Sequence, residues 1–188
     1  MTRKSTGWAT AVHLENDAQD FQGVAVHKGL FHDFKLSFLR GSYVVLLFYP
    51  LSFNTFAPTN LADKDVPRDP LNFRQRVNDF RDLDCEVVAV STDSHYVQLA
   101  YSSMTEDFGD DEETEMFYFS DIDHEVSKRF GVLKEDEGIS YNGLFILDRH
   151  GFVQHVVRND LPIEFDVDET LRVLKLLKKR ESTSDATE

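Results

Sequence analysis

The amino-acid sequence predicts an α/β fold in which helices flank a mixed central β-sheet. Three short apolar runs, rich in β-branched and aromatic residues, have the pattern of strands buried on both faces; they are Tyr43–Tyr49, Glu86–Ser91 and Gly143–Asp148. A turn at residues 149–151 follows the third run, and Phe152–Val157 then reads as its hairpin partner. Strands that alternate with helical segments and end in an antiparallel hairpin favour a mixed sheet.

The predicted helices lie between these strands. Asp69 is a suitable N-cap with Pro70 at the first helical position, and Phe73, Val77 and Phe80 follow at the spacing of a core-facing stripe. Three further helices are predicted, at Ser94–Tyr101, at His124–Phe130 and from about Asp168 to Arg180. The last has leucines on one stripe and acidic residues at its start, as expected for a helix packed on the sheet.

One domain is expected, because the chain has 188 residues and no internal repeat. We assign residues 18–180 to this domain, 1–17 to an N-terminal lead-in and 181–188 to a disordered acidic tail. The 34 acidic residues outnumber the 20 Lys and Arg, which gives a net charge of −14. Such a charge repels nucleic acid and anionic lipid, so we expect neither as a partner. The basic cluster at 178–180 is explained by the end of a helix.

The chain has a single cysteine, Cys85, so an internal disulfide is excluded and nothing indicates a secreted, disulfide-stapled fold. No apolar run approaches the ~20 residues of a membrane span. The cytosol is therefore the expected compartment. The alternative is the mitochondrion, because Arg3 and Lys4 precede the first acid, Glu15, as in a short presequence.

No metal site or cofactor is expected. His27 and His32, with Asp33 beside them, have a spacing that suits no common zinc pattern, so we interpret them as surface histidines. The acidic run Glu106–Glu115 lacks the ligand order of an EF-hand and is interpreted as a solvated loop, with weak divalent-cation binding or docking of a basic partner as alternatives. The cluster at 91–94 is interpreted as a helix cap rather than a nucleophile.

The segment from Phe48 to Asn60 reads FYPLSFNTFAPTN. It closely resembles the active-site motif of the two-cysteine peroxiredoxins, Phe-Tyr-Pro-Leu-Asp-Phe-Thr-Phe-Val-Cys-Pro-Thr-Glu. The resemblance extends from about Asp20 to Arg180 through further segments in the family's order, at Cys85–Tyr101, Phe130–Asp148 and Asn159–Arg172. It implies a thioredoxin-like fold, a homodimer or a higher ring-like oligomer, and a hetero-assembly with an active peroxiredoxin as a further option.

The same resemblance implies that the active-site chemistry has been lost. The reacting cysteine of the family is matched by Ala57, whose methyl group cannot attack a peroxide. Four other active-site positions have also changed: the threonine is matched by Asn54, the glutamate by Asn60, and two arginines by Asn142 and Phe165. The resolving cysteine has no counterpart. A Cys→Ala change made in the laboratory would explain Ala57 but not these other changes.

The chain also differs from the family pattern by an insertion. Residues 61–70 add about nine residues to the family pattern, and the two prolines among them should break the helix. The insertion is interpreted either as a new contact surface or as a tolerated loop.

Cys85 matches a core position of the family, and burial between Asp84 and Glu86 should raise its pKa. The expected function is therefore that of a pseudoenzyme acting as a structural or binding module. The alternatives are a residual peroxidase or redox sensor that uses Cys85, and a holdase-type chaperone.

Overall fold

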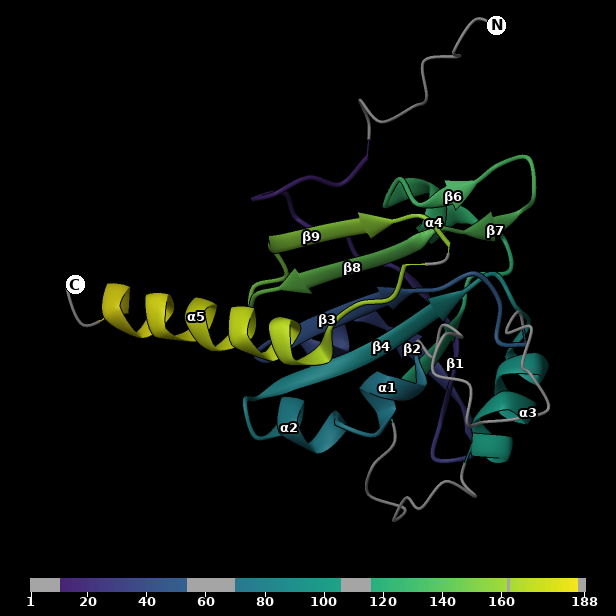
Figure 1. Cartoon of the computed structure of the whole chain (residues 1–188), viewed down its shortest axis with the longest axis horizontal. Helices are drawn as coiled ribbons and strands as arrows, with labels where there is room; N and C mark the ends of the chain where they lie inside the picture. The colour runs from purple at the N-terminus through teal and green to yellow at the C-terminus, as the bar shows by residue number, and fades with distance from the viewer. Residues whose placement is uncertain (1–10, 54–69, 106–115, 162, 186–188) are drawn as a thin grey trace, which may run out of the picture.

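A computed structural model describes residues 11–53, 70–105, 116–161 and 163–185. Seven strands form one sheet in the order β2-β1-β5-β4-β3-β8-β9, and β6 and β7 form a separate two-stranded ladder (Figure 1). The strands of the large sheet are β1 (Gln22–His27), β2 (Leu30–Lys35), β3 (Tyr43–Phe48), β4 (Cys85–Ser91), β5 (Phe117–Ser120), β8 (Asn142–Leu147) and β9 (Val153–Asn159); β6 is Leu133–Lys134 and β7 is Ile139–Ser140. Strands β3, β4 and β5 run parallel, and the other ladders are antiparallel. The predicted mixed sheet is thus confirmed.

Strand β3 lies inside the sheet, between β4 and β8, and is buried along its whole length. Its side chains alternate between two apolar clusters, because successive residues of a strand point to opposite faces. Val44, Leu46 and Phe48 belong to one cluster, whereas Val45 and Leu47 belong to the other. All three runs predicted to be strands buried on both faces are strands of this central region.

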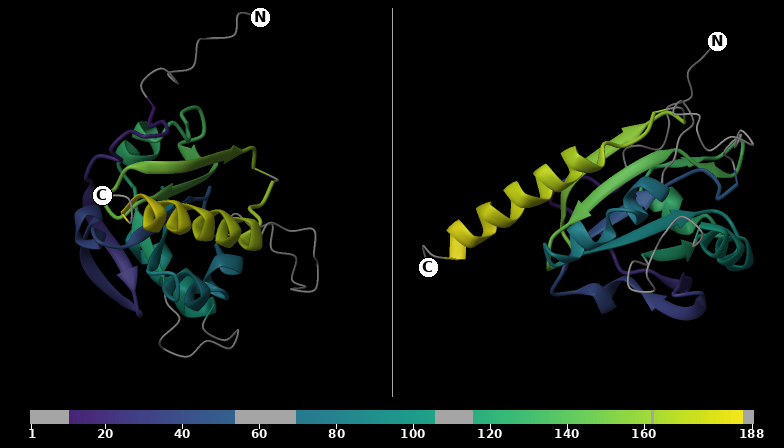
Figure 2. Two further views of the ribbon diagram at one scale, coloured as in Figure 1. Left: turned by 90° about the vertical axis from the view of Figure 1, so that its left-hand side faces the viewer. Right: turned by 60° about the horizontal axis from the view of Figure 1, so that its bottom comes forward.

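Helices cover both faces of the sheet (Figures 1 and 2). The face with Val45 and Leu47 is covered by α1 (Leu71–Arg74), α2 (Val77–Arg81), α3 (His95–Thr105) and α5 (Val167–Asp185). The opposite face is covered by α4 (Glu125–Arg129) and by the 3-10 turn Leu36–Leu39. None of the helices in the described ranges combines the length and apolarity that crossing a membrane requires.

The helix predicted after Asp69 differs from the expectation, because it is divided into α1 and α2. Phe73, Val77 and Phe80 all lie in the core, as predicted. The break is at Arg76, whose backbone (φ −117°, ψ 14°) leaves the helical region. The Arg76 guanidinium binds Asp79 and reaches Asp168 of α5 at 3.1 Å, so a contact with a distant helix accompanies the break.

Both ends of the domain are more ordered than the sequence predicts. Helix α5 continues past Arg180 to Asp185, so residues 181–185, assigned above to the tail, are helical. The Tyr43 hydroxyl donates a hydrogen bond of 2.9 Å to the Glu181 carboxylate and fixes this extension to the first residue of β3. In the lead-in, Val12 is buried and its N–H donates to the Arg129 carbonyl at 3.1 Å.

Gly143 in β8 lies opposite Phe48 and allows the close approach of neighbouring side chains. A Cβ atom at this position would lie 2.7 Å from Cγ1 of Val132, with Phe145 and Phe48 also in contact. We predict that Gly143→Ala lowers the free energy of unfolding by about 1–3 kcal/mol through overpacking, as measured by urea denaturation. Val132→Ala should recover part of this loss in the double variant; strictly additive effects of the two changes would contradict the contact.

Candidate functional site

The carboxyl ends of the parallel strands β3, β4 and β5 lie together at one end of the sheet. We call this end the carboxyl edge, which is distinct from the outermost strands β2 and β9. Open α/β sheets bind their ligands at this position. A hydrogen-bonded network links these ends. The Ser52 N–H donates to Oδ2 of Asp93 at 2.6 Å, and the same oxygen accepts from Oγ of Ser91 at 3.0 Å. The Tyr49 hydroxyl and Oγ of Ser52 share a bond of 3.0 Å. The chain leaving β3 is therefore fixed to the β4–α3 turn up to Ser52.

The network continues into α3 and β5. Nε2 of Gln98 donates to Oγ of Ser91 at 3.2 Å and to the Phe119 carbonyl at 2.7 Å, and Oγ of Ser120 donates to the Asp93 carbonyl at 2.7 Å. Ser94 caps α3 by accepting from the Val97 N–H at 3.4 Å. The interpretation of residues 91–94 as a cap is confirmed. Burial raises the pKa of the Tyr49 phenol, so that hydroxyl remains protonated within the network.

Asn142 and Phe165 lie beside this edge, on β8 and just before α5. Asn142 is buried, and its amide donates to the carbonyls of Leu161 and Ile163 at 3.1 and 3.0 Å. Phe165 is buried in the apolar cluster that includes Leu171 and Leu174 of α5. Both side chains therefore serve to hold the β9–α5 connection, and neither carries a charge.

Three of the other predicted site residues, Asn54, Ala57 and Asn60, lie outside the described residues, as do most of the 61–70 insertion and the acidic run 106–115. Their predicted roles therefore stay predictions. The described part of the site consists of the residues that precede them, at the end of β3, and those that surround the carboxyl edge of the sheet.

Cys85 lies at the opposite edge of the sheet. It is the first residue of β4 and is paired with Tyr43, whereas the site begins beyond Phe48 and Val90 at the other end of the same ladder. Five residues of strand separate these positions by ~17 Å. The thiol is only 1% exposed, and burial, with a smaller effect of the Glu86 carboxylate, raises its pKa. The predicted buried environment of Cys85 is confirmed.

Arg74 of α1 is a buried cation near the site that the sequence analysis did not single out. It is 1% exposed, and its guanidinium donates to the Ser102 carbonyl at 2.9 Å. It also favours the ionised form of the buried Tyr118 phenol, whose pKa is nevertheless raised, mainly by burial. Its burial could have been expected from the sequence, because Arg74 is next to Phe73 and within one helical turn of Val77, both of which were predicted to face the core.

Comparison with known proteins identifies a family over most of the chain. The AhpC/TSA family matches residues 14–156. Peroxiredoxin-2 of Rattus norvegicus is 40% identical over 163 residues, which cover 87% of this chain and 78% of the relative. The chain belongs to the peroxiredoxin family, AhpC/TSA. Its single cysteine is compatible with loss of the family's activity.

Solved structures of peroxiredoxins confirm the thioredoxin-like fold. The AhpC of Enterococcus faecalis has a TM-score of 0.76 at 27% identity, with 90% of this chain and 94% of the other covered. The mitochondrial 2-cys peroxiredoxin of Plasmodium falciparum has a TM-score of 0.75 at 30% identity, with 92% and 98% covered. The fold of this peroxiredoxin-family chain therefore follows that of its relatives over most of both lengths.

Of the two histidines of the β1–β2 hairpin, His32 is exposed as predicted, whereas His27 is less exposed than the sequence indicates. His27 is only partly exposed and stacks on Phe117 with ring centroids 4.2 Å apart, and burial lowers its pKa to about 4. Nε2 of His32 lies 3.2 Å from the His27 carbonyl oxygen and donates to it in the tautomer that carries the proton on Nε2. Over the part of the chain that the structure describes, no group of three metal-ligating side chains comes together.

We predict that Asn142→Asp makes stability strongly dependent on pH. The new carboxylate would face two carbonyl oxygens in a buried position, so its pKa in the folded state would be raised above the unfolded value of about 4. The destabilisation should be small below about pH 4 and grow to about 2 kcal/mol or more at pH 7.

Urea denaturation between pH 4 and 8 measures this effect. Asn78→Asp, the same change at an exposed position of α2, is the matched control and should show little pH dependence. Equal pH profiles for the two variants would contradict the assigned role of the Asn142 amide.

Proposed function

We propose that this chain is a peroxiredoxin-family pseudoenzyme, without thiol peroxidase activity, that acts as a structural or binding module. The observation that carries the proposal is that the only cysteine lies buried at the edge of the sheet opposite the site. The sequence resemblance, in addition, matches Ala57 to the family's reacting cysteine. Peroxide reduction requires an accessible thiolate. Burial of Cys85 and the direction of its pKa both oppose thiolate formation.

The charge at the site supports the same proposal. Where the resemblance implies two arginines, the chain has a buried amide, Asn142, and a buried ring, Phe165. A nearby cation stabilises a thiolate, whereas a neutral amide that donates to main-chain carbonyls contributes no net charge. Loss of the cations and of the thiol together is expected of a site that no longer performs the reaction.

Assembly is the second part of the proposal. Strands β2 and β9 are the two ends of the sheet order, so each has one side that is not paired within this sheet. Unpaired strand edges are templates for association with another chain. We propose a homodimer or higher ring-like oligomer, or a hetero-assembly with an active peroxiredoxin. The proposed compartment is the cytosol, with the mitochondrion, named for the Plasmodium falciparum relative, as the alternative.

The activity is tested by hydroperoxide turnover with a thiol reductant, comparing the unmodified chain with Cys85→Ser and using an active peroxiredoxin as a positive control. We predict no turnover above the uncatalysed rate for either form, because neither presents a reactive thiolate. Turnover by the unmodified chain that disappears in Cys85→Ser would establish the alternative, a residual peroxidase or redox sensor that uses this thiol.

The assembly is tested separately by light scattering over a range of micromolar concentrations. We predict a mass above that of the 21.7 kDa monomer. Mixing with an active peroxiredoxin, followed by native mass spectrometry, distinguishes a homo-oligomer from a hetero-assembly. A monomer under both conditions would contradict the assembly proposal without affecting the proposed loss of peroxidase activity.

A further inference from the structure

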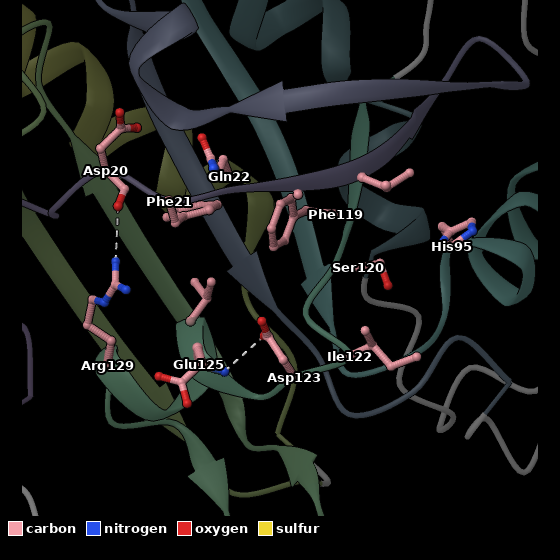
Figure 3. Close-up of a pocket in the computed structure, with 13 residues that line it drawn as sticks. Asp20, Phe21, Gln22, His95, Phe119, Ser120, Ile122, Asp123, Glu125 and Arg129 are labelled. Carbon is pink, nitrogen blue, oxygen red and sulfur yellow. Dashed lines mark hydrogen bonds between the residues drawn. The ribbon is translucent and has the colours of Figure 1, made fainter.

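A groove opens beside β1 and adjoins the network described above at Phe119 and Ser120 of β5 (Figure 3). The β1–β5 ladder pairs only Ala25 with Phe119 and Val26 with Tyr118, so the two strands separate over Gln22–Val24. The resulting cavity has a volume of ≈ 670 Å³. This lies within the range of about 300–1,000 Å³ that is typical of ligand pockets.

The inner wall of the groove is apolar. Phe21 and Phe119 pack edge to face with centroids 5.0 Å apart, and Gly23 permits this arrangement because its missing Cβ would lie 2.9 Å from the Phe119 ring. Ile122 stands at the rim and is 61% exposed. An aliphatic stem placed here would cover an apolar side chain that now faces water.

Charge is distributed unevenly along the groove. At one end the Asp20 carboxylate pairs with Lys35 at 3.2 Å, and the Arg129 guanidinium donates to the Asp20 carbonyl at 3.2 Å. Glu125 lies one turn before Arg129 in α4, and Asp123 lies just before that helix (Figure 3). Both carboxylates are exposed, and neither forms an ion pair within the described part of the chain. The Asp123 carboxylate accepts the Glu125 N–H at 3.2 Å (Figure 3) and interacts with the side chain of Asp121. This part of the groove therefore presents two exposed carboxylates, with Arg129 as the neighbouring cation.

We propose that this groove binds a basic, extended peptide segment of a partner protein. The aliphatic stem of an arginine or lysine lies against Phe119 and Ile122, and its cation lies beside Asp123 and Glu125. An extended segment fits because the groove follows β1 where its side toward β5 is outside the ladder, and main-chain hydrogen bonds can be formed there. The cation satisfies the two carboxylates, and the stem covers the exposed apolar surface.

The test is a residue-resolved NMR titration of the full chain with a glycine-leucine-arginine-leucine-glycine peptide, capped at both ends. The matched probe is the same peptide with citrulline, which keeps the shape of arginine and removes its charge. We expect amide shifts at Gln22–Val24 and Ile122–Val126 with a Kd on the order of 0.1–1 mM, and binding of the citrulline peptide about ten-fold weaker.

Two double variants assign the effect to the groove. Asp123→Asn with Glu125→Gln should weaken binding of the arginine peptide about ten-fold. Glu135→Gln with Asp136→Asn removes the same charge from the exposed β6–β7 turn and should leave binding unchanged. The NMR spectrum also reports whether each variant is folded.

Three results would overturn the proposal: equal binding of the arginine and citrulline peptides, equal weakening by the two double variants, or no shift at the groove up to about 5 mM peptide. Peroxide turnover plays no part in this experiment, so its outcome is independent of the proposed loss of activity.

Discussion

Strand β3 has to be kept from water on both of its faces, and the arrangement of the other elements follows from that requirement. Its six residues, Tyr43–Phe48, are all buried, and each large apolar side chain buried in this way contributes about 1.5–3 kcal/mol. Pairing with β4 on one side and β8 on the other satisfies its main chain. Helices α1, α2 and α5 then cover one row of its side chains, while α4 lies over the other.

The position of the site is a consequence of this central strand. The chain leaves β3 at the carboxyl edge of the sheet, where several polar side chains are buried and must be paired with one another. Asp93 pairs with both Ser52 and Ser91 and so fixes the direction of the segment that follows. None of these interactions involves a reactive group. The contacts that hold this part of the fold are therefore separate from the chemistry that a site here could perform.

Much of the fold could be predicted from the sequence, because continuous apolar runs and helical periodicity are local signals. Tertiary contacts set the features that could not be predicted. The extension of α5 depends on a hydrogen bond between Tyr43 and Glu181, which are 138 residues apart, and the break at Arg76 coincides with an ion pair to α5. The groove depends on where the β1–β5 ladder ends, which is a matter of register rather than composition.

For the site, the resemblance singled out Asn142 and Phe165, but only the structure shows what these side chains contact. The Asn142 amide binds two carbonyls of the β9–α5 connection, and Phe165 belongs to the core. Arg74 was missed because a charged residue on an otherwise apolar helical face is normally exposed. Its burial requires a main-chain partner, the Ser102 carbonyl, that periodicity alone does not reveal.

We propose that a thiol at position 57 would not be held ionised, because the two arginines that the resemblance implies are matched by Asn142 and Phe165. The most direct measurement is the thiol pKa of Ala57→Cys in a Cys85→Ser background, obtained from the pH dependence of the alkylation rate. Because Asn142 and Phe165 are neutral, we predict a pKa near the ordinary value of about 8.5. A pKa below about 6 would show that the site still stabilises a thiolate and would argue against the proposed pseudoenzyme.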